Sequence, residues 1–84
     1  MELFHAILTE KALEQLVGRG IEEAAVRAVL KTPLDVLQVR AGKVVAQAVI
    51  GGYLLRLFVD IDRDPPEVVT AYRASKIEKY RRQP

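Results

Sequence analysis

The sequence predicts an α+β fold, in which a two-helix hairpin packs on one face of an antiparallel β-sheet meander and a short C-terminal helix ends the chain. Three observations predict this fold class. Apolar residues recur at helical spacing in residues 9–32, strand-like apolar segments follow from residue 34, and short glycine-containing stretches separate those segments. Short connections join antiparallel neighbours, so we expect three or four strands in a single domain, residues 1–84.

The hairpin begins at Thr9, whose hydroxyl can cap the first helix. This helix has an apolar face of four residues at helical spacing: Ala12, Leu13, Leu16 and Val17. The stretch 18–20 ends it, and Glu22 and Glu23 suit the first turn of the second helix. The second apolar face consists of Ala25, Val26, Val29 and Leu30. Pro33 prevents this helix from continuing, so we expect both apolar faces to meet a common sheet.

The sheet is predicted from four segments rich in β-branched and aromatic residues: 34–40, 43–50, 53–61 and 67–72. Gly51-Gly52 indicates a two-residue hairpin, because both positions can take positive φ without a Cβ clash. Residues 2–8 are interpreted as a further short strand. The last helix is predicted over 76–82, where Ser75 and Glu78 have the spacing of a capping box.

The composition excludes several classes of protein. Cysteine is absent, which rules out a disulfide framework and indicates a cytoplasmic location. His5 is the only histidine, so a two-histidine metal site is excluded and we expect neither metal nor cofactor. No apolar run reaches the roughly 18–20 residues of a membrane span, and no membrane partner is expected.

Positive charge is concentrated at the C-terminal end. Residues 73–84 hold five Lys/Arg and one acid, a local charge of +4, whereas the first 72 residues sum to −2. Tyrosines lie among these cations, and a basic cluster with aromatic residues favours a polyanionic partner, most simply RNA.

Arg56 interrupts an otherwise apolar strand. Alternation places Tyr53, Leu55, Leu57 and Val59 on the core face, which leaves Arg56 beside Phe58 on the second face. Two interpretations stay open: a phosphate-binding arginine, or a solvated arginine whose stem covers its apolar neighbours and which pairs with Asp60.

The last strand has the same alternation, with Val69 and Ala71 predicted in the core. Thr70 and Tyr72 then share the surface of Arg56, and Arg73 and Ser75 lie at its end. The candidate catalytic residues are Arg56, Tyr72, Arg73 and Lys76. The candidate RNA-binding residues are Lys11, Arg19, Lys79, Arg81 and Arg82. His5, Ile77 and Tyr80 are interpreted as structural residues.

The chain resembles a known bacterial family, the domain of unknown function 4258. The resemblance rests on Arg19-Gly20-Ile21 between two helices, on Pro33, on the glycine-separated strands and on the closing segment 69–76. That family is similar in layout to RelE- and BrnT-type toxins. The resemblance implies a ribosome-associated or free RNA endonuclease that an antitoxin silences. The family often has a His-Ala pair eight residues before the arginine, where this chain has Lys11-Ala12, and lysine is not an ordinary base at neutral pH.

Two functional hypotheses follow. The first is a toxin-like, metal-independent RNA endonuclease, because cations and tyrosine can stabilise the crowded phosphate and move protons. The second is a non-catalytic RNA- or protein-binding module of the same fold, which the missing histidine favours; a gyrase-inhibiting relative is a third possibility. The expected partners are RNA or the ribosome, an antitoxin protein, and a second copy of the chain, since an exposed sheet edge favours dimers.

Overall fold

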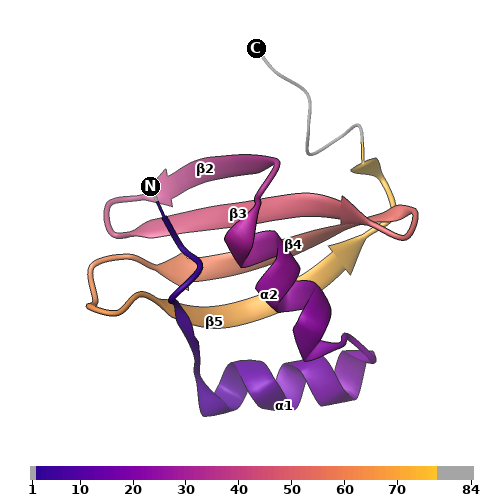
Figure 1. Cartoon of the computed structure of the whole chain (residues 1–84), viewed down its shortest axis with the longest axis horizontal. Coiled ribbons are helices and arrows are strands. Elements are labelled where there is room, and N and C mark those ends of the chain that lie inside the picture. The colour runs from indigo at the N-terminus through magenta and orange to yellow at the C-terminus, as the bar shows by residue number, and fades with distance from the viewer. Residues whose placement is uncertain (1, 78–84) are drawn as a thin grey trace.

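The computed structural model describes residues 2–77 and confirms an α+β fold in which helices pack on a sheet. The sheet has five strands in the order β1-β5-β4-β3-β2 (Figure 1). In chain order the elements are β1 (Ile7–Leu8), α1 (Glu10–Arg19), α2 (Glu23–Lys31), β2 (Asp35–Arg40), β3 (Lys43–Ile50), β4 (Tyr53–Asp60) and β5 (Glu67–Ala74).

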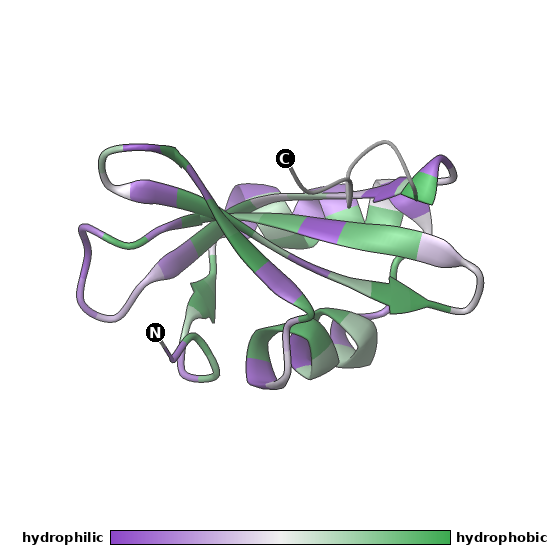
Figure 2. Cartoon of the chain, turned by 90° about the horizontal axis from the view of Figure 1, so that it is seen from above, coloured by the Kyte–Doolittle hydropathy of each residue, from purple (hydrophilic) through white to green (hydrophobic). Residues whose placement is uncertain are grey.

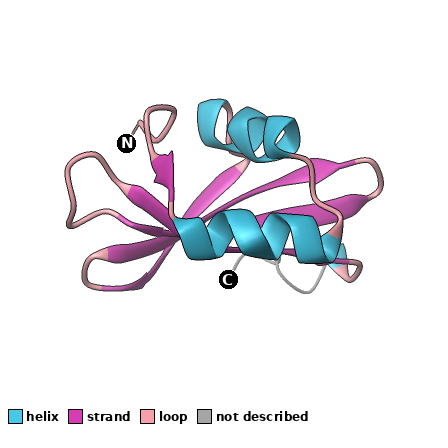
Figure 3. Ribbon diagram, turned by 90° about the horizontal axis from the view of Figure 1, so that it is seen from below, coloured by secondary structure: helices cyan, strands magenta, loops and turns pink. Residues whose placement is uncertain are grey.

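Helix α1 is capped as the sequence predicts, but it does not lie on the face of the sheet as predicted. The Thr9 hydroxyl accepts a hydrogen bond from the Ala12 amide, and Gly20 ends the helix in the left-handed conformation. The helix runs along the outer edge of β5 rather than across the face of the sheet (Figure 3). Only one side of α1 is therefore covered: Leu16 is buried, whereas Val17, predicted in the core, is 85% exposed.

Helix α2 lies on the face of the sheet, over β3 and β4 (Figures 1 and 2). Its predicted apolar face is confirmed, with Val26, Val29 and Leu30 buried and Ala25 partly buried. The helix ends at Lys31, one residue before the Thr32 cap and two before Pro33. The two predicted helices exist, but α2 covers the face and α1 covers an edge.

Strands β2 to β5 form the predicted antiparallel meander. Gly51 and Gly52 have φ of 56° and 89°, and Ile50 pairs with Tyr53 across them. The prediction of a purely antiparallel sheet is wrong, because β1 pairs in parallel with β5. Only Ile7 and Leu8 of the segment 2–8 form this strand, and His5 lies in a turn before it.

The core lies between α2, α1 and one face of the sheet, where β4 contributes Leu55, Leu57 and Val59 as expected. One register prediction in β5 is wrong. The pairing with β4 shifts between Phe58 and Val59, so Val59 faces Val68, and Val68 rather than Val69 is in the core. Such a bulge inserts one extra residue and moves the alternation by one position.

The predicted last helix, 76–82, lies outside the described residues except for its first two positions, and so does the Glu78 half of its cap. Within the described residues, no helix has the length and apolar character needed to cross a membrane.

Candidate functional site

Four polar side chains form one row across four strands, on the sheet face opposite α2: Asp35, Gln47, Arg56 and Tyr72. We call this set the polar row. It follows directly from the register, in which Asp35 pairs with Gln47, Gln47 with Arg56, and Arg56 with Tyr72. Directly opposed residues in a sheet share a face and come close enough to interact. The predicted shared surface of Arg56, Thr70 and Tyr72 therefore exists.

Hydrogen bonds run along the whole polar row. The Gln47 amide donates to Asp35 Oδ2 at 3.0 Å, and its carbonyl accepts from Arg56 Nε at 2.9 Å. Arg56 Nη1 in turn donates to the Tyr72 hydroxyl. Gln47 is fully buried, so both ends of its amide are used inside the protein. These bonds fix the plane and position of the Arg56 guanidinium.

Two aromatic rings flank this guanidinium. Its central carbon lies 5.5 Å from the centre of the Tyr72 ring and 6.0 Å from that of Phe58. The rings themselves are 6.0 Å apart and inclined by only 24°. A cation within about 6 Å of a ring centre is attracted to its face. Arg56 is therefore held by polar and aromatic contacts together. Its position beside Phe58, on the sheet face away from the core, agrees with the prediction from the sequence.

A shallow depression of about 250 Å³ lies at the C-terminal end of β5. Its lining runs from the polar row to the first described residues of the basic segment: Tyr72, Arg73, Ala74, Ser75 and Lys76. The volume is below the roughly 300 Å³ at which drug-sized pockets begin. A phosphate or sugar-sized group suits a depression of this size better than a whole cofactor does.

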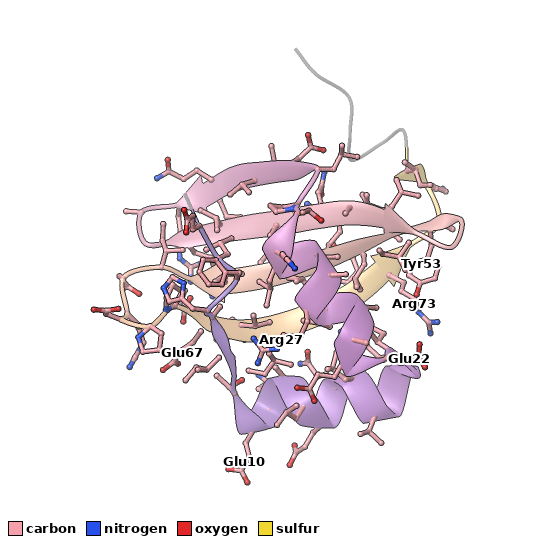
Figure 4. The ribbon with its side chains drawn as sticks, in the orientation of Figure 1. Glu10, Glu22, Arg27, Tyr53, Glu67 and Arg73 are labelled. Carbon is pink, nitrogen blue, oxygen red and sulfur yellow. The ribbon has the colours of Figure 1, made fainter. Side chains whose placement is uncertain are left out.

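Arg73 does not lie at the end of the Arg56 surface, as the sequence predicted. It is next to Tyr72 in a strand, so it points to the opposite face, where its guanidinium carbon is 5.4 Å from the centre of the Tyr53 ring. Its Nη2 donates to the carbonyl of Arg19. Figure 4 shows Arg73 and Tyr53 at one end of the molecule and Glu67 at the other.

Arg19 is engaged with the edge of β5. Its Nη1 donates to the Ala71 carbonyl at 2.5 Å, while the Gln15 side chain accepts from the Ala71 amide at 3.3 Å. Gln15 and Arg19 are one turn apart on α1, so the helix binds both backbone groups of one strand residue. Arg19 and Arg73 thus form a second cationic pair, separated from Arg56 by the sheet.

Of the other predicted cations, Lys11 and Lys76 are not members of the polar row, and the remaining three lie outside the described residues. Lys76 is exposed at the depression, and Lys11 is exposed on the first turn of α1. The eight residues from Lys11 to Arg19 span about 12 Å of helix, so these two cations lie at opposite ends of α1. Lys79, Arg81 and Arg82 lie outside the described residues.

Acidic residues gather at the far end of the strands. Two of their ion pairs in the described part of the chain are Lys43 with Asp60 at 3.1 Å and Arg63 with Glu67 at 4.0 Å. His5 lines a depression at this end, together with Asp64, and so lies away from the polar row. Residues 2–77 contain no group of three or more His, Asp or Glu that could hold a metal ion.

Asp35 and Gln47 are two site residues that were not predicted from the sequence. A usable indication was present for Gln47, because the two-residue turn at Gly51-Gly52 places Ile50 opposite Tyr53 and, counting back three pairs, Gln47 opposite Arg56. Asp35 had no comparable indication, since the bulge between Gln38 and Arg40 makes the register of β2 irregular.

Comparison of the chain with protein-family models, with curated proteins and with solved structures gives no match.

Proposed function

We propose that the chain is a toxin-like, RNA-interacting protein that binds RNA through the polar row and the depression at the end of β5. The observation that carries this proposal is the Arg56 guanidinium, held by Gln47 and Tyr72 and flanked by two rings. A fixed guanidinium binds phosphate with defined geometry, and aromatic rings such as the half-buried Phe58 and Tyr72 can stack on unpaired bases. Both groups occur together at this one place.

The charge distribution supports the same partner. Arg19, Arg73 and Lys76 lie towards one end of the strands, whereas around the other end the four acids Asp60, Asp62, Asp64 and Glu67 outnumber Lys43 and Arg63. A separation of this kind orients a polyanion towards the basic end before contact is made. The resemblance to the domain of unknown function 4258 also favours a toxin-like, RNA-interacting protein. We include in the proposal a relationship to RelE- and BrnT-type toxins and an antitoxin protein as partner.

The first form of the proposal is an enzyme that cleaves RNA without a metal ion. The 2′-hydroxyl of the RNA would lose its proton to water and its oxygen would attack phosphorus; the bond to the 5′-oxygen would break, and a 2′,3′-cyclic phosphate and a 5′-hydroxyl would result. Arg56 is placed to stabilise the charge on phosphorus. The Tyr72 hydroxyl accepts from Arg56, so its own proton remains to be donated to the leaving oxygen.

Binding without cleavage is the second candidate, and one observation favours it. A base must take the 2′-proton, yet the two residues that flank Arg56 in the polar row, Gln47 and Tyr72, are a neutral amide and a phenol. His5, the histidine of the chain, lies at the acidic end. Tyr72→Phe separates the candidates, because it removes the proton donor and keeps the ring.

The experiment measures the affinity of fluorescently labelled single-stranded RNA by anisotropy, at several salt concentrations, for Arg56→Ala and for a matched control, Arg63→Ala. We expect Arg56→Ala to weaken binding about tenfold and to lower the salt slope by about one, since one phosphate contact is lost. Arg63 lies at the acidic end and should change affinity less than about twofold. Equal affinities for the two variants, with both folded by circular dichroism, contradict the proposal.

Cleavage is followed on gels with the same RNA and with translating ribosomes. Cyclic-phosphate products that Tyr72→Phe abolishes, at RNA concentrations that saturate the variant, identify the enzyme. Binding with intact RNA in every reaction identifies the non-catalytic module. Failure of the wild-type chain to bind RNA at low salt refutes both forms of the proposal.

A further inference from the structure

The two edges of the sheet are treated differently in the described structure. The outer edge of β5 is covered along its length: β1 pairs with Glu67 and Val68, and α1 binds the backbone of Ala71 through Gln15 and Arg19. At the other edge lies β2, and within residues 2–77 its one sheet neighbour is β3 (Figure 1). A strand with one neighbour presents unpaired backbone groups to a further strand.

The side chains on and beside β2 are unusually apolar for such an edge. Leu34 is 50% exposed, Val36 is 37% exposed and Val39 is 48% exposed. Single exposed apolar residues are ordinary, but two on an edge strand and a third directly before it favour covering of that edge. Helix α2 lies over β3 and β4 and leaves this surface uncovered.

We propose that β2 pairs with β2 of a second copy of the chain, antiparallel and centred on Leu37. A two-fold axis perpendicular to the sheet then places Leu37 opposite its own copy and Val36 opposite Gln38 of the second copy. The bulge between Gln38 and Arg40 sets the ends of this pairing, because it brings Arg40, rather than Val39, level with Asp35 of the second copy.

The charges of β2 are complementary to themselves in this register. Asp35 pairs with Gln47, and Arg40 pairs with Lys43, which pairs in turn with Asp60 on the face that carries Arg56. Asp35 and Arg40 therefore share one face, and each end of the two-fold pair brings one acid opposite one cation. Arg40 is exposed, and no carboxylate of residues 2–77 lies within 4.0 Å of it.

This self-complementarity selects a second copy over an unrelated strand. Opposite charges directly across a strand pair stabilise it, whereas like charges oppose it. Moving the centre by one residue to Val36 or Gln38 loses the contact between Asp35 and Arg40. The pairing is short, so we expect a weak dimer with a dissociation constant in roughly the micromolar range.

Dimerisation would also extend the polar row. Asp35 accepts from Gln47 within its own chain, and a carboxylate can accept several donors at once. Arg40 of the second copy would then continue the row that runs from Tyr72 through Arg56 and Gln47. The inference does not depend on RNA binding, because the association of the chain with itself is measured without RNA.

The test is sedimentation equilibrium over about 1 μM to 1 mM protein, the range in which weak interfaces associate. Arg40→Glu and Asp35→Lys each turn both attractive contacts of the dimer into repulsive ones. We expect each variant alone to dimerise at least about tenfold more weakly than the wild type. An equimolar mixture of the two variants has only attractive contacts, and it should recover affinity to within about threefold of the wild type.

Arg63→Glu is the matched control, since it makes the same change of charge away from β2 and should leave dimerisation unchanged. Asp35→Lys also removes a contact of Gln47, so Val36→Lys provides a second disruption that leaves the polar row intact. A monomeric wild type up to 1 mM overturns the proposal. So does a dimer that survives Arg40→Glu and Val36→Lys, or a mixture of folded variants that stays monomeric.

Discussion

Gln47→Leu tests how much the polar row contributes to stability. The side chain is fully buried, and it joins Asp35 and Arg56 through bonds of 3.0 and 2.9 Å. Leucine has a similar volume and can take part in neither bond. The substitution therefore removes two hydrogen bonds without leaving a large cavity, and it separates the polar contribution of this position from packing.

The expected loss follows from the two bonds. A hydrogen bond to a charged group contributes about 1.5–3 kcal/mol net. Asp35 and Arg56 are half-buried and regain some water, and the buried leucine returns about 1 kcal/mol of apolar transfer free energy. We expect a net loss of about 2–3 kcal/mol, which lowers Tm by about 10–20 °C in a domain of this length.

Urea unfolding followed by circular dichroism measures this loss as a lower midpoint at constant slope. Gln38→Leu is the matched control, because Gln38 is exposed on the neighbouring strand and should change stability by less than about 0.5 kcal/mol. If the two variants unfold at the same urea concentration, the hydrogen bonds of the polar row do not stabilise the fold, and the reasoning is refuted.

Two further predictions concern α1 and use the same urea assay. Thr9→Ala should cost about 1–2 kcal/mol, because the hydroxyl accepts from the Ala12 amide and donates to the Val68 carbonyl, whereas the exposed Thr32→Ala should cost less than about 0.5 kcal/mol; equal losses would exclude Thr9 as a cap. Leu16→Ala should cost about 2–4 kcal/mol and Val17→Ala almost nothing, since α1 buries only one side; a costly Val17→Ala would contradict this placement.

Local features of the fold could be predicted from the sequence. The Thr9 cap, the end of α2 before Pro33 and the hairpin at Gly51-Gly52 depend on a few adjacent residues each. The hairpin also fixes the register of β3 and β4 along their length, so the face shared by Arg56 and Phe58 followed from alternation alone.

Features that depend on distant contacts could not be predicted. Val17 has the spacing of a core residue, but α1 is held at the edge of β5 by Gln15 and Arg19, and an edge buries less of a helix than a face does. The parallel pairing of β1 joins segments about 60 residues apart, and the bulge in β5 depends on one extra residue, Val69. Neither feature is visible in the composition or the periodicity of the sequence.

The two polar pairs between β3 and β4 differ in the charge of the residue that faces the cation. Lys43 faces Asp60 at 3.1 Å, so that cation is neutralised by its cross-strand neighbour. Arg56 faces Gln47 on one side and Tyr72 on the other, and both are uncharged. We therefore propose Arg56, rather than Lys43, as the cation of these two strands that contacts a phosphate.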